Sequence, residues 1–200
     1  ANTYSGATTI NGGTLSVGTL ANGSSNSSIG ASGSTATNLV LGGGTLKYTG
    51  NTASTDRNFT ITDGTTGTIE VSTSGQTLTI SGAAAATTGA LTKTGAGILA
   101  LSGANAYTGI TTVSDGTLKN GAADVINNSS AVQVANGATW DLNGNNETVA
   151  SIADASGSTT GTIALGAATL TIGGSSTTTF AGTVTGSGSI VFSGTGSTVL

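Results

Sequence analysis

The chain has 200 residues, a net charge of −4 and only twelve charged side chains, with no Cys, His, Met or Pro. Its four basic residues are too few and too scattered for a phosphate track, which excludes the basic footprint of a nucleic-acid-binding protein. Without His or Cys, it also lacks Ser-His-Asp and Cys-His catalysis and imidazole or thiolate metal sites. We therefore expect no cofactor, and we expect Lys47, Arg57, Lys93 and Lys119 to be isolated, solvated side chains.

The composition is poor in large apolar residues, because Gly, Ser and Thr make up half the chain and Leu, Ile, Val and Phe a fifth. That fraction is at the lower edge of what a folded core requires. Low charge and the period-two pattern, as in Thr77-Leu78-Thr79-Ile80, nevertheless favour ordered strands over disorder. No apolar run approaches the roughly 20 residues of a membrane span, so we expect any export signal or anchor of the parent protein to lie outside this segment.

In chain order, short apolar runs bounded by Gly, Ser, Asn and Asp predict nineteen strands and no helix. The first half is expected to form strands at 7–10, 13–17, 38–41, 44–48, 57–61, 67–71, 76–80 and 90–94. The second half is expected to form them at 98–101, 110–113, 116–120, 131–135, 138–142, 147–152, 161–165, 168–172, 177–181, 189–192 and 197–200. Residues 21–36 are rich in Asn, Gly and Ser, with Ile29 the one large apolar residue, and predict a protruding loop.

The chain repeats itself. Residues 1–15 align without gaps on residues 104–118 and are identical at nine of fifteen positions, and residues 194–200 resemble residues 95–101. We interpret residues 1–200 as a single unit made of two approximate repeats, about 1–103 and 104–200, within a longer array that has no capping element here.

Repeated corners favour a solenoid of stacked coils over a β-sandwich, because nothing in a sandwich requires a similar strand and corner to recur. Gly-Thr-Leu occurs at Gly13, Gly44 and Gly116. Nineteen strands predict roughly 7 to 9 coils and a length of about 35 to 45 Å, with Leu15, Leu46 and Leu118 in one inner column. The positions predicted to carry the repeat are Tyr4, Gly13, Leu15, Gly44, Leu46, Gly95, Gly97, Leu101, Tyr107, Gly116 and Leu118.

Candidate chemistry is limited to carboxylates and hydroxyls. Asp141 and Glu147 are the nearest pair for glycoside hydrolysis, with Trp140 as a sugar platform, but Trp140 is better explained as filling an enlarged coil. No calcium-binding motif is present, so no metal site is expected. The Thr-x-Thr pairs are spaced too irregularly for one pair per coil, so we expect ordinary solvent-facing threonines rather than a regular hydroxyl ladder.

The stretch Gly95–Leu118 reads Gly-Ala-Gly-Ile-Leu-Ala-Leu-Ser-Gly-Ala-Asn-Ala-Tyr-Thr-Gly-Ile-Thr-Thr-Val-Ser-Asp-Gly-Thr-Leu. It closely resembles the autotransporter-associated β-strand repeat, also called the passenger-associated transport repeat, as does the shorter copy at residues 1–15. The resemblance implies a right-handed parallel β-helix from a bacterial surface or secreted protein, exported through a C-terminal outer-membrane barrel.

On this resemblance we expect a non-catalytic stalk segment of an extracellular, autotransporter-type adhesin, which presents distal domains and folds stepwise during export. Expected partners are neighbouring coils of the parent chain or other copies, host or cell-surface glycans, and the parent's outer-membrane barrel, but no nucleic acid. Two alternatives stay open: a filament subunit that stacks head to tail, and a polysaccharide-active β-helix enzyme.

Overall fold

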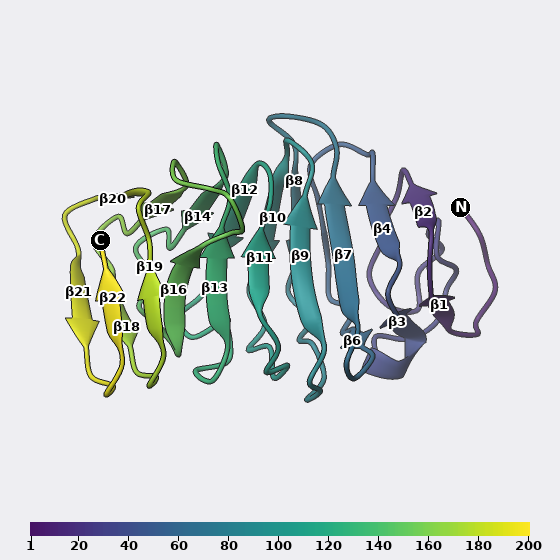
Figure 1. Cartoon of the computed structure of the whole chain (residues 1–200). Coiled ribbons are helices and arrows are strands. Elements are labelled where there is room, and N and C mark those ends of the chain that lie inside the picture. The colour runs from purple at the N-terminus through teal and green to yellow at the C-terminus, as the bar shows by residue number, and fades with distance from the viewer.

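The computed structural model describes residues 1–200 as a parallel β-solenoid of about eight coils, which confirms the all-β solenoid prediction. Figure 1 shows the strands stacked along one axis, with the colour changing steadily from the N-terminal to the C-terminal end. Every pair of named strands is parallel, because each strand bonds to its counterpart in the next coil. The one helical element is a single 3-10 turn, η1 (Ala36–Asn38).

Two seven-stranded sheets form two faces of the solenoid. We call the first the front sheet, and it consists of β2 (Thr14–Val17), β4 (Thr45–Tyr48), β7 (Thr66–Val71), β9 (Ala90–Thr94), β11 (Thr111–Val113), β13 (Ala131–Val134) and β16 (Ser151–Asp154). The second sheet consists of β5 (Ala53–Thr55), β8 (Thr77–Ile80), β10 (Ile98–Leu101), β12 (Thr117–Asn120), β14 (Thr139–Asp141), β17 (Thr162–Ala164) and β20 (Thr183–Thr185).

A third face is less continuous and precedes the front sheet in each coil. It contains one three-stranded sheet near each end, formed by β1 (Thr8–Ile10), β3 (Leu39–Leu41) and β6 (Thr60–Ile61), and by β15 (Glu147–Val149), β18 (Thr169–Ile172) and β21 (Ser189–Phe192). A two-stranded sheet of β19 (Thr177–Thr179) and β22 (Ser197–Val199) lies beside β16 and extends the front face (Figure 1). The chain thus passes from the third face to the front sheet and then to the second sheet.

The nineteen predicted strands are all present, and the structure adds three. β5 and β20 were missed because each offers at most one branched apolar residue, and their pairing with β8 and β17 defines them as strands. The predicted strand at 147–152 divides at a corner into β15 and β16. Local pattern therefore locates apolar strands, whereas short polar strands depend on the neighbouring coil.

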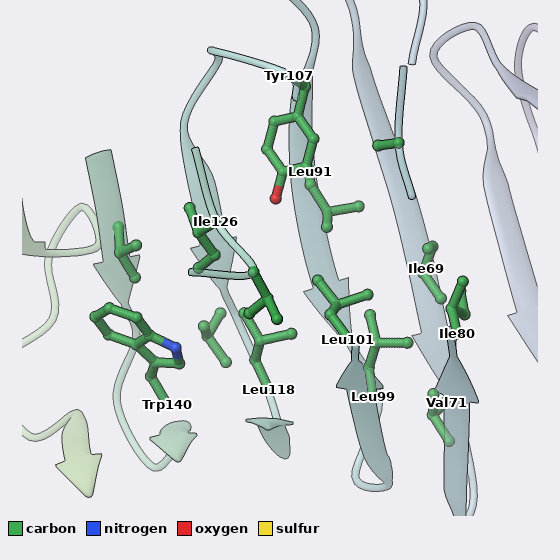
Figure 2. Close-up of a cluster of buried hydrophobic side chains, with 14 of the residues drawn as sticks. Ile69, Val71, Ile80, Leu91, Leu99, Leu101, Tyr107, Leu118, Ile126 and Trp140 are labelled. Atoms are coloured by element: carbon green, nitrogen blue, oxygen red, sulfur yellow. The ribbon is translucent and has the colours of Figure 1, made fainter. Parts of the chain in front are cut away.

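Apolar side chains form separate inner columns, one set for each face. In the second sheet, Leu78, Leu99, Leu118, Trp140 and Ile163 succeed one another in register, and Figure 2 shows Leu99, Leu118 and Trp140 in the interior. Leu15 pairs with Leu46 in the front sheet. The predicted single column through Leu15, Leu46 and Leu118 is therefore wrong, because the same tripeptide occupies two different faces.

The Thr-x-Thr pairs do not stack on one another, as expected, but single threonines of the front sheet do form a column. Thr14, Thr45, Thr68, Thr92 and Thr112 follow one another in register on the outer surface of the front sheet. These are single threonines, two of them at the first position of their strands and three further along, and loops of unequal length absorb their irregular spacing. Thr14 pairs with Thr45 thirty-one residues later, whereas Thr92 pairs with Thr112 twenty residues later.

The two copies of the repeated motif also occupy different faces. Residues 1–17 contribute β1 on the third face and β2 in the front sheet, while the matching residues 104–120 contribute β11 in the front sheet and β12 in the second. One sequence therefore folds in the same way at two corners of the coil, shifted by one face.

Candidate functional site

Asn105 is the centre of the repeated motif and joins three consecutive coils. Its Oδ1 accepts a hydrogen bond from the Ala84 amide of the preceding coil at 2.7 Å, and its Nδ2 donates to the Val125 carbonyl of the following coil at 2.8 Å. Nδ2 also donates to Gly103 O in its own coil at 2.9 Å. Asn105 is buried, and its Oδ1 is the partner of the buried Ala84 amide, while the Val125 carbonyl accepts from both the side chain and the backbone amide of Asn105.

The motif tyrosine closes the same corner. Tyr107 is fully buried, its ring points into the interior (Figure 2), and its hydroxyl lies 2.7 Å from Thr111 Oγ1. Burial raises the pKa of Tyr107 well above its ordinary value. In the first copy, Tyr4 makes the same bond to Thr8 Oγ1 at 2.6 Å, but its side chain is 44% exposed. The Tyr–Thr pair is therefore local, and an adjacent coil completes its burial.

Glycines in the central motif allow successive backbones to touch. A Cβ at Gly109 would collide with the Gly89 carbonyl, and one at Gly116 would collide with the carbonyls of Gly95 and Gly97. Gly116 also has a φ of 62°, a left-handed conformation that favours glycine. These positions thus require glycine for contact between coils, and at Gly116 for the turn as well.

The other predicted repeat positions divide between buried and open environments. Leu46, Leu101 and Leu118 are buried and Leu15 is half-buried. A Cβ added at Gly44 would collide with Ile10, and one added at Gly97 would collide with Thr73 O. A Cβ added at Gly13 meets no atom within 4 Å.

Lys93 is buried, which corrects the prediction that all four basic side chains are solvated. It lies in the inner column of the front sheet between Ile69 and Val113, and its Nζ donates to the carbonyls of Thr94, Gly95 and Asp115 at 2.7 to 3.1 Å. Burial lowers the pKa of Lys93 to about 8. The ammonium therefore closes two successive turns from inside the solenoid.

Arg57 is the second buried basic residue and holds the irregular segment 21–36. Its Nε donates to Ala21 O at 3.0 Å, and its Nη atoms donate to Ser32 O at 2.8 Å and Gly30 O at 3.0 Å. Ile29 is fully buried within the same segment. One guanidinium thus supplies the donors that a regular strand would have provided.

The period-two alternation of the sequence could have predicted that both cations are buried. Arg57 lies two and four positions before Phe59 and Ile61, and Lys93 lies two positions after Leu91. Both cations therefore point to the same, inner side of the strand as these apolar neighbours. Lys47 and Lys119 have the outward phase, and they form ion pairs with Glu70 at 2.8 Å and Asp141 at 3.9 Å.

The two carboxylates considered for glycoside hydrolysis, Asp141 and Glu147, lie in different environments. Asp141 lies outward beside Lys119, whereas Glu147 is buried and accepts bonds from Asn120 Nδ2 at 2.7 Å and the Val125 amide at 3.0 Å. Asn120 Oδ1 in turn accepts a bond from Trp140 Nε1 at 3.0 Å. Burial outweighs these bonds and raises the pKa of Glu147 to about 7. Trp140 therefore fills the coil as expected, and Glu147 organises a buried polar network.

Residues 1–17 and 91–119, which hold both Asn–Tyr–Thr corners, match the family model of the passenger-associated transport repeat. Residues 1–17 and 91–119 therefore carry passenger-associated transport repeats. The chain is 48% identical over 197 residues to "Adhesin BmaC autotransporter" of Brucella suis biovar 1 (strain 1330). The aligned region covers 96% of this chain and 6% of that protein. No solved structure matches this chain.

The repeat segment has no helix long and apolar enough to cross a membrane. Its carboxylates do not gather into groups of three or more that could hold a metal ion.

Proposed function

We propose that this chain is a structural, non-catalytic stalk segment of a bacterial surface or secreted autotransporter-type adhesin. Its role is to hold distal domains away from the cell, which places it outside the cell. The observation that carries this proposal is the pair of overlapping seven-stranded parallel sheets, β2 to β16 and β5 to β20, which together run along the molecule. About eight coils at ~4.8 Å each span roughly 40 Å, so the segment acts as a spacer of fixed length. The similarity to an autotransporter described as an adhesin supports the same role.

Stepwise folding during export is the second part of the proposal. Strand pairs join residues nineteen to thirty-one positions apart, as in Leu99 with Leu118 and Thr14 with Thr45. A chain that emerges gradually can therefore add each coil to the previous one without waiting for distant partners. We infer that this local folding favours outward movement of the polypeptide.

The test is to delete residues 1–200 from a parent passenger with a distal tag, and to measure tag height above the cell by electron microscopy. We expect the tag to remain displayed and binding by the distal domains to persist, with a height lower by about 40 Å. Saturable binding of the isolated segment to host cells, with loss of binding after deletion, would instead indicate a ligand-binding module.

Export is tested by replacing Gly116 with Ala in the same parent. We expect fewer displayed molecules, because the added methyl blocks coil-on-coil contact. The control is Gly137→Ala, where an added Cβ meets no atom within 4 Å. Unchanged display of the Gly116 variant would contradict folding-assisted export.

A further inference from the structure

Residues 121–130 form a segment that covers part of the interior without belonging to a sheet. They connect β12 in the second sheet to β13 in the front sheet, and none of them lies in a strand. Val125 and Ile126 are nevertheless buried, and Figure 2 shows Ile126 in the interior with Tyr107 and Trp140. The segment therefore closes its coil across the third face, in the part that no sheet covers.

The buried carboxylate of Glu147 holds this segment from the following coil. Its Oε2 accepts hydrogen bonds from the Val125 amide at 3.0 Å, the Ile126 amide at 3.3 Å and Asn120 Nδ2 at 2.7 Å. Its Oε1 accepts one from the Thr148 amide at 3.2 Å. Neither the Val125 amide nor the Ile126 amide donates to a backbone carbonyl. One side chain thus takes the place that a paired strand has elsewhere in the solenoid.

The repeated motif holds the segment from the preceding coil. Val125 O accepts from the backbone amide of Asn105 at 3.1 Å and from its side-chain amide at 2.8 Å. Ser130 Oγ donates to Tyr107 O at 3.0 Å. The segment lies outside the sheets, so it can open without breaking a pair of strands. Such an opening requires less free energy than global unfolding.

The groups around Glu147 disfavour its charge. Burial, and to a lesser extent the nearby charge of Asp124 in the same segment, raise the pKa of Glu147 to about 7. Tyr107 also faces this carboxyl and stays neutral, because burial raises the pKa of Tyr107 well above its ordinary value. The next strand, β18, places Leu170 opposite Glu147, and Lys119 of β12 lies on the outer surface. No basic side chain therefore compensates the charge of an ionised Glu147.

Opening of the segment would admit water to the carboxyl, where its pKa returns to about 4.5. The ionised form of Glu147 therefore favours the open segment, and the protonated form favours the closed one. The opening equilibrium should increase as pH rises from about 4.5 to 7 and stay level above this range. The difference between the two pKa values corresponds to an increase of roughly 300-fold.

We propose that residues 121–130 form a pH-sensitive lid, which is closed over Glu147 when this carboxyl is protonated and opens more often when it is ionised. Opening uncovers Ile126 and the Asn105–Tyr107 corner of the repeated motif, while the sheets on either side stay paired. The lid does not depend on the stalk role, so either proposal can fail without the other.

The test is amide hydrogen exchange of the whole chain from pH 4 to 9, corrected for the pH dependence of the chemical step. We expect protection of the Val125 and Ile126 amides to fall by about 100-fold or more between pH 4 and 8. At pH 8 these amides should exchange at least tenfold faster than those of β4 and β7, which serve as the reference for global unfolding. Exchange no faster than the reference, or faster exchange with protection independent of pH, would overturn the proposal.

Glu147→Gln removes the ionisable carboxyl, and Glu70→Gln, at the only other glutamate, is the matched control. Glu70 lies on the outer surface and pairs with Lys47, far from the lid. We expect the pH dependence of protection at Val125 and Ile126 to disappear in Glu147→Gln and to persist in Glu70→Gln. A Glu147→Gln protein with the pH dependence of the wild type would contradict the proposed lid.

Trp140 provides a second measurement that does not require Glu147→Gln to fold. It is the single tryptophan, and its Nε1 donates to Asn120 Oδ1, while Asn120 Nδ2 donates to Glu147. Its fluorescence should therefore change as Glu147 ionises, with a midpoint near pH 7.

Asp124→Asn removes the charge that faces Glu147 and keeps a residue type that tolerates the left-handed φ of 50° at this position. We expect the fluorescence midpoint of Trp140 and the pH at which the lid loses protection to shift together to lower pH. A midpoint that shifts without a matching change in exchange at Val125 and Ile126 would show that Glu147 titrates under a closed lid, and the proposal would be wrong.

Discussion

Asn105 illustrates how much of the solenoid depends on single polar side chains. One amide group satisfies Ala84 N in the preceding coil and Val125 O in the following coil, and both partners are removed from water. A side chain with both a donor and an acceptor is needed, which an ionised Asp does not supply. The asparagine therefore acts as a connection between coils as well as a turn residue.

Replacing Asn105 with Ala should lower the free energy of unfolding by about 2 to 4 kcal/mol, because it removes three hydrogen bonds and leaves the buried Ala84 amide without a partner. The measurement is denaturant-induced unfolding followed by circular dichroism. The control is Asn2→Ala, at the equivalent position of the first copy, where the side chain is exposed and donates one bond to Ser28 O. We expect a loss below about 1 kcal/mol there, and equal losses at both sites would refute the connecting role.

At the scale of the strand and its corner, glycine sets how closely successive coils approach. Gly116 and Gly137 both have positive φ values, 62° and 74°, so both incur the same backbone strain when substituted. Only Gly116 lies against the backbone of the preceding coil. The pair therefore separates the cost of conformation from the cost of contact.

We expect Gly137→Ala to destabilise the protein by about 1 to 2 kcal/mol, through left-handed strain alone. Gly116→Ala should lower the free energy of unfolding by roughly 2 kcal/mol more than Gly137→Ala does, because the neighbouring strands must also separate. Chemical unfolding of both variants gives the difference, and exchange at β10 and β12 locates it. If the two losses were equal, close contact at Gly116 would have no energetic importance.

At the scale of the whole molecule, two buried ionisable groups make stability depend on pH in opposite directions. Glu147 has a pKa raised to about 7 by burial, so the folded state binds more protons than the unfolded state above pH ~4.5. Lys93 has a pKa lowered to about 8 by burial, so the unfolded state binds more protons between pH ~8 and ~10. Stability should therefore fall as pH rises from about 4.5 to 7, and rise again from about 8 to 10.

Each change should amount to roughly 3 kcal/mol, the free-energy equivalent of each pKa shift. Equilibrium unfolding at a series of pH values measures both slopes. Glu147→Gln should flatten the acid-side slope and leave the alkaline one, whereas Lys93→Met should do the reverse. A wild-type stability that is constant across both ranges would show that neither group is titrated differently in the folded state.

The sequence by itself determined the class of the fold and the positions of its strands. Period-two alternation and glycine-rich corners are local properties. Residues such as Leu78, Leu99 and Gly116 therefore predict strands and turns without information about the adjacent coils. The resemblance to transport repeats came from the same local pattern, since the Tyr–Thr pair and its corner lie within a few residues of one another.

Only the tertiary structure decided which face each copy of the motif occupies. Coils differ in length, so equal sequences fall on different faces, and Leu118 joins the column of Leu99 rather than that of Leu15. Alternation gives Arg57 and Lys93 an inward phase, but only the tertiary structure shows which carbonyls of distant turns accept hydrogen bonds from their charged groups. These features depend on contacts between coils, and a one-dimensional pattern carries no information about how many residues each coil will use.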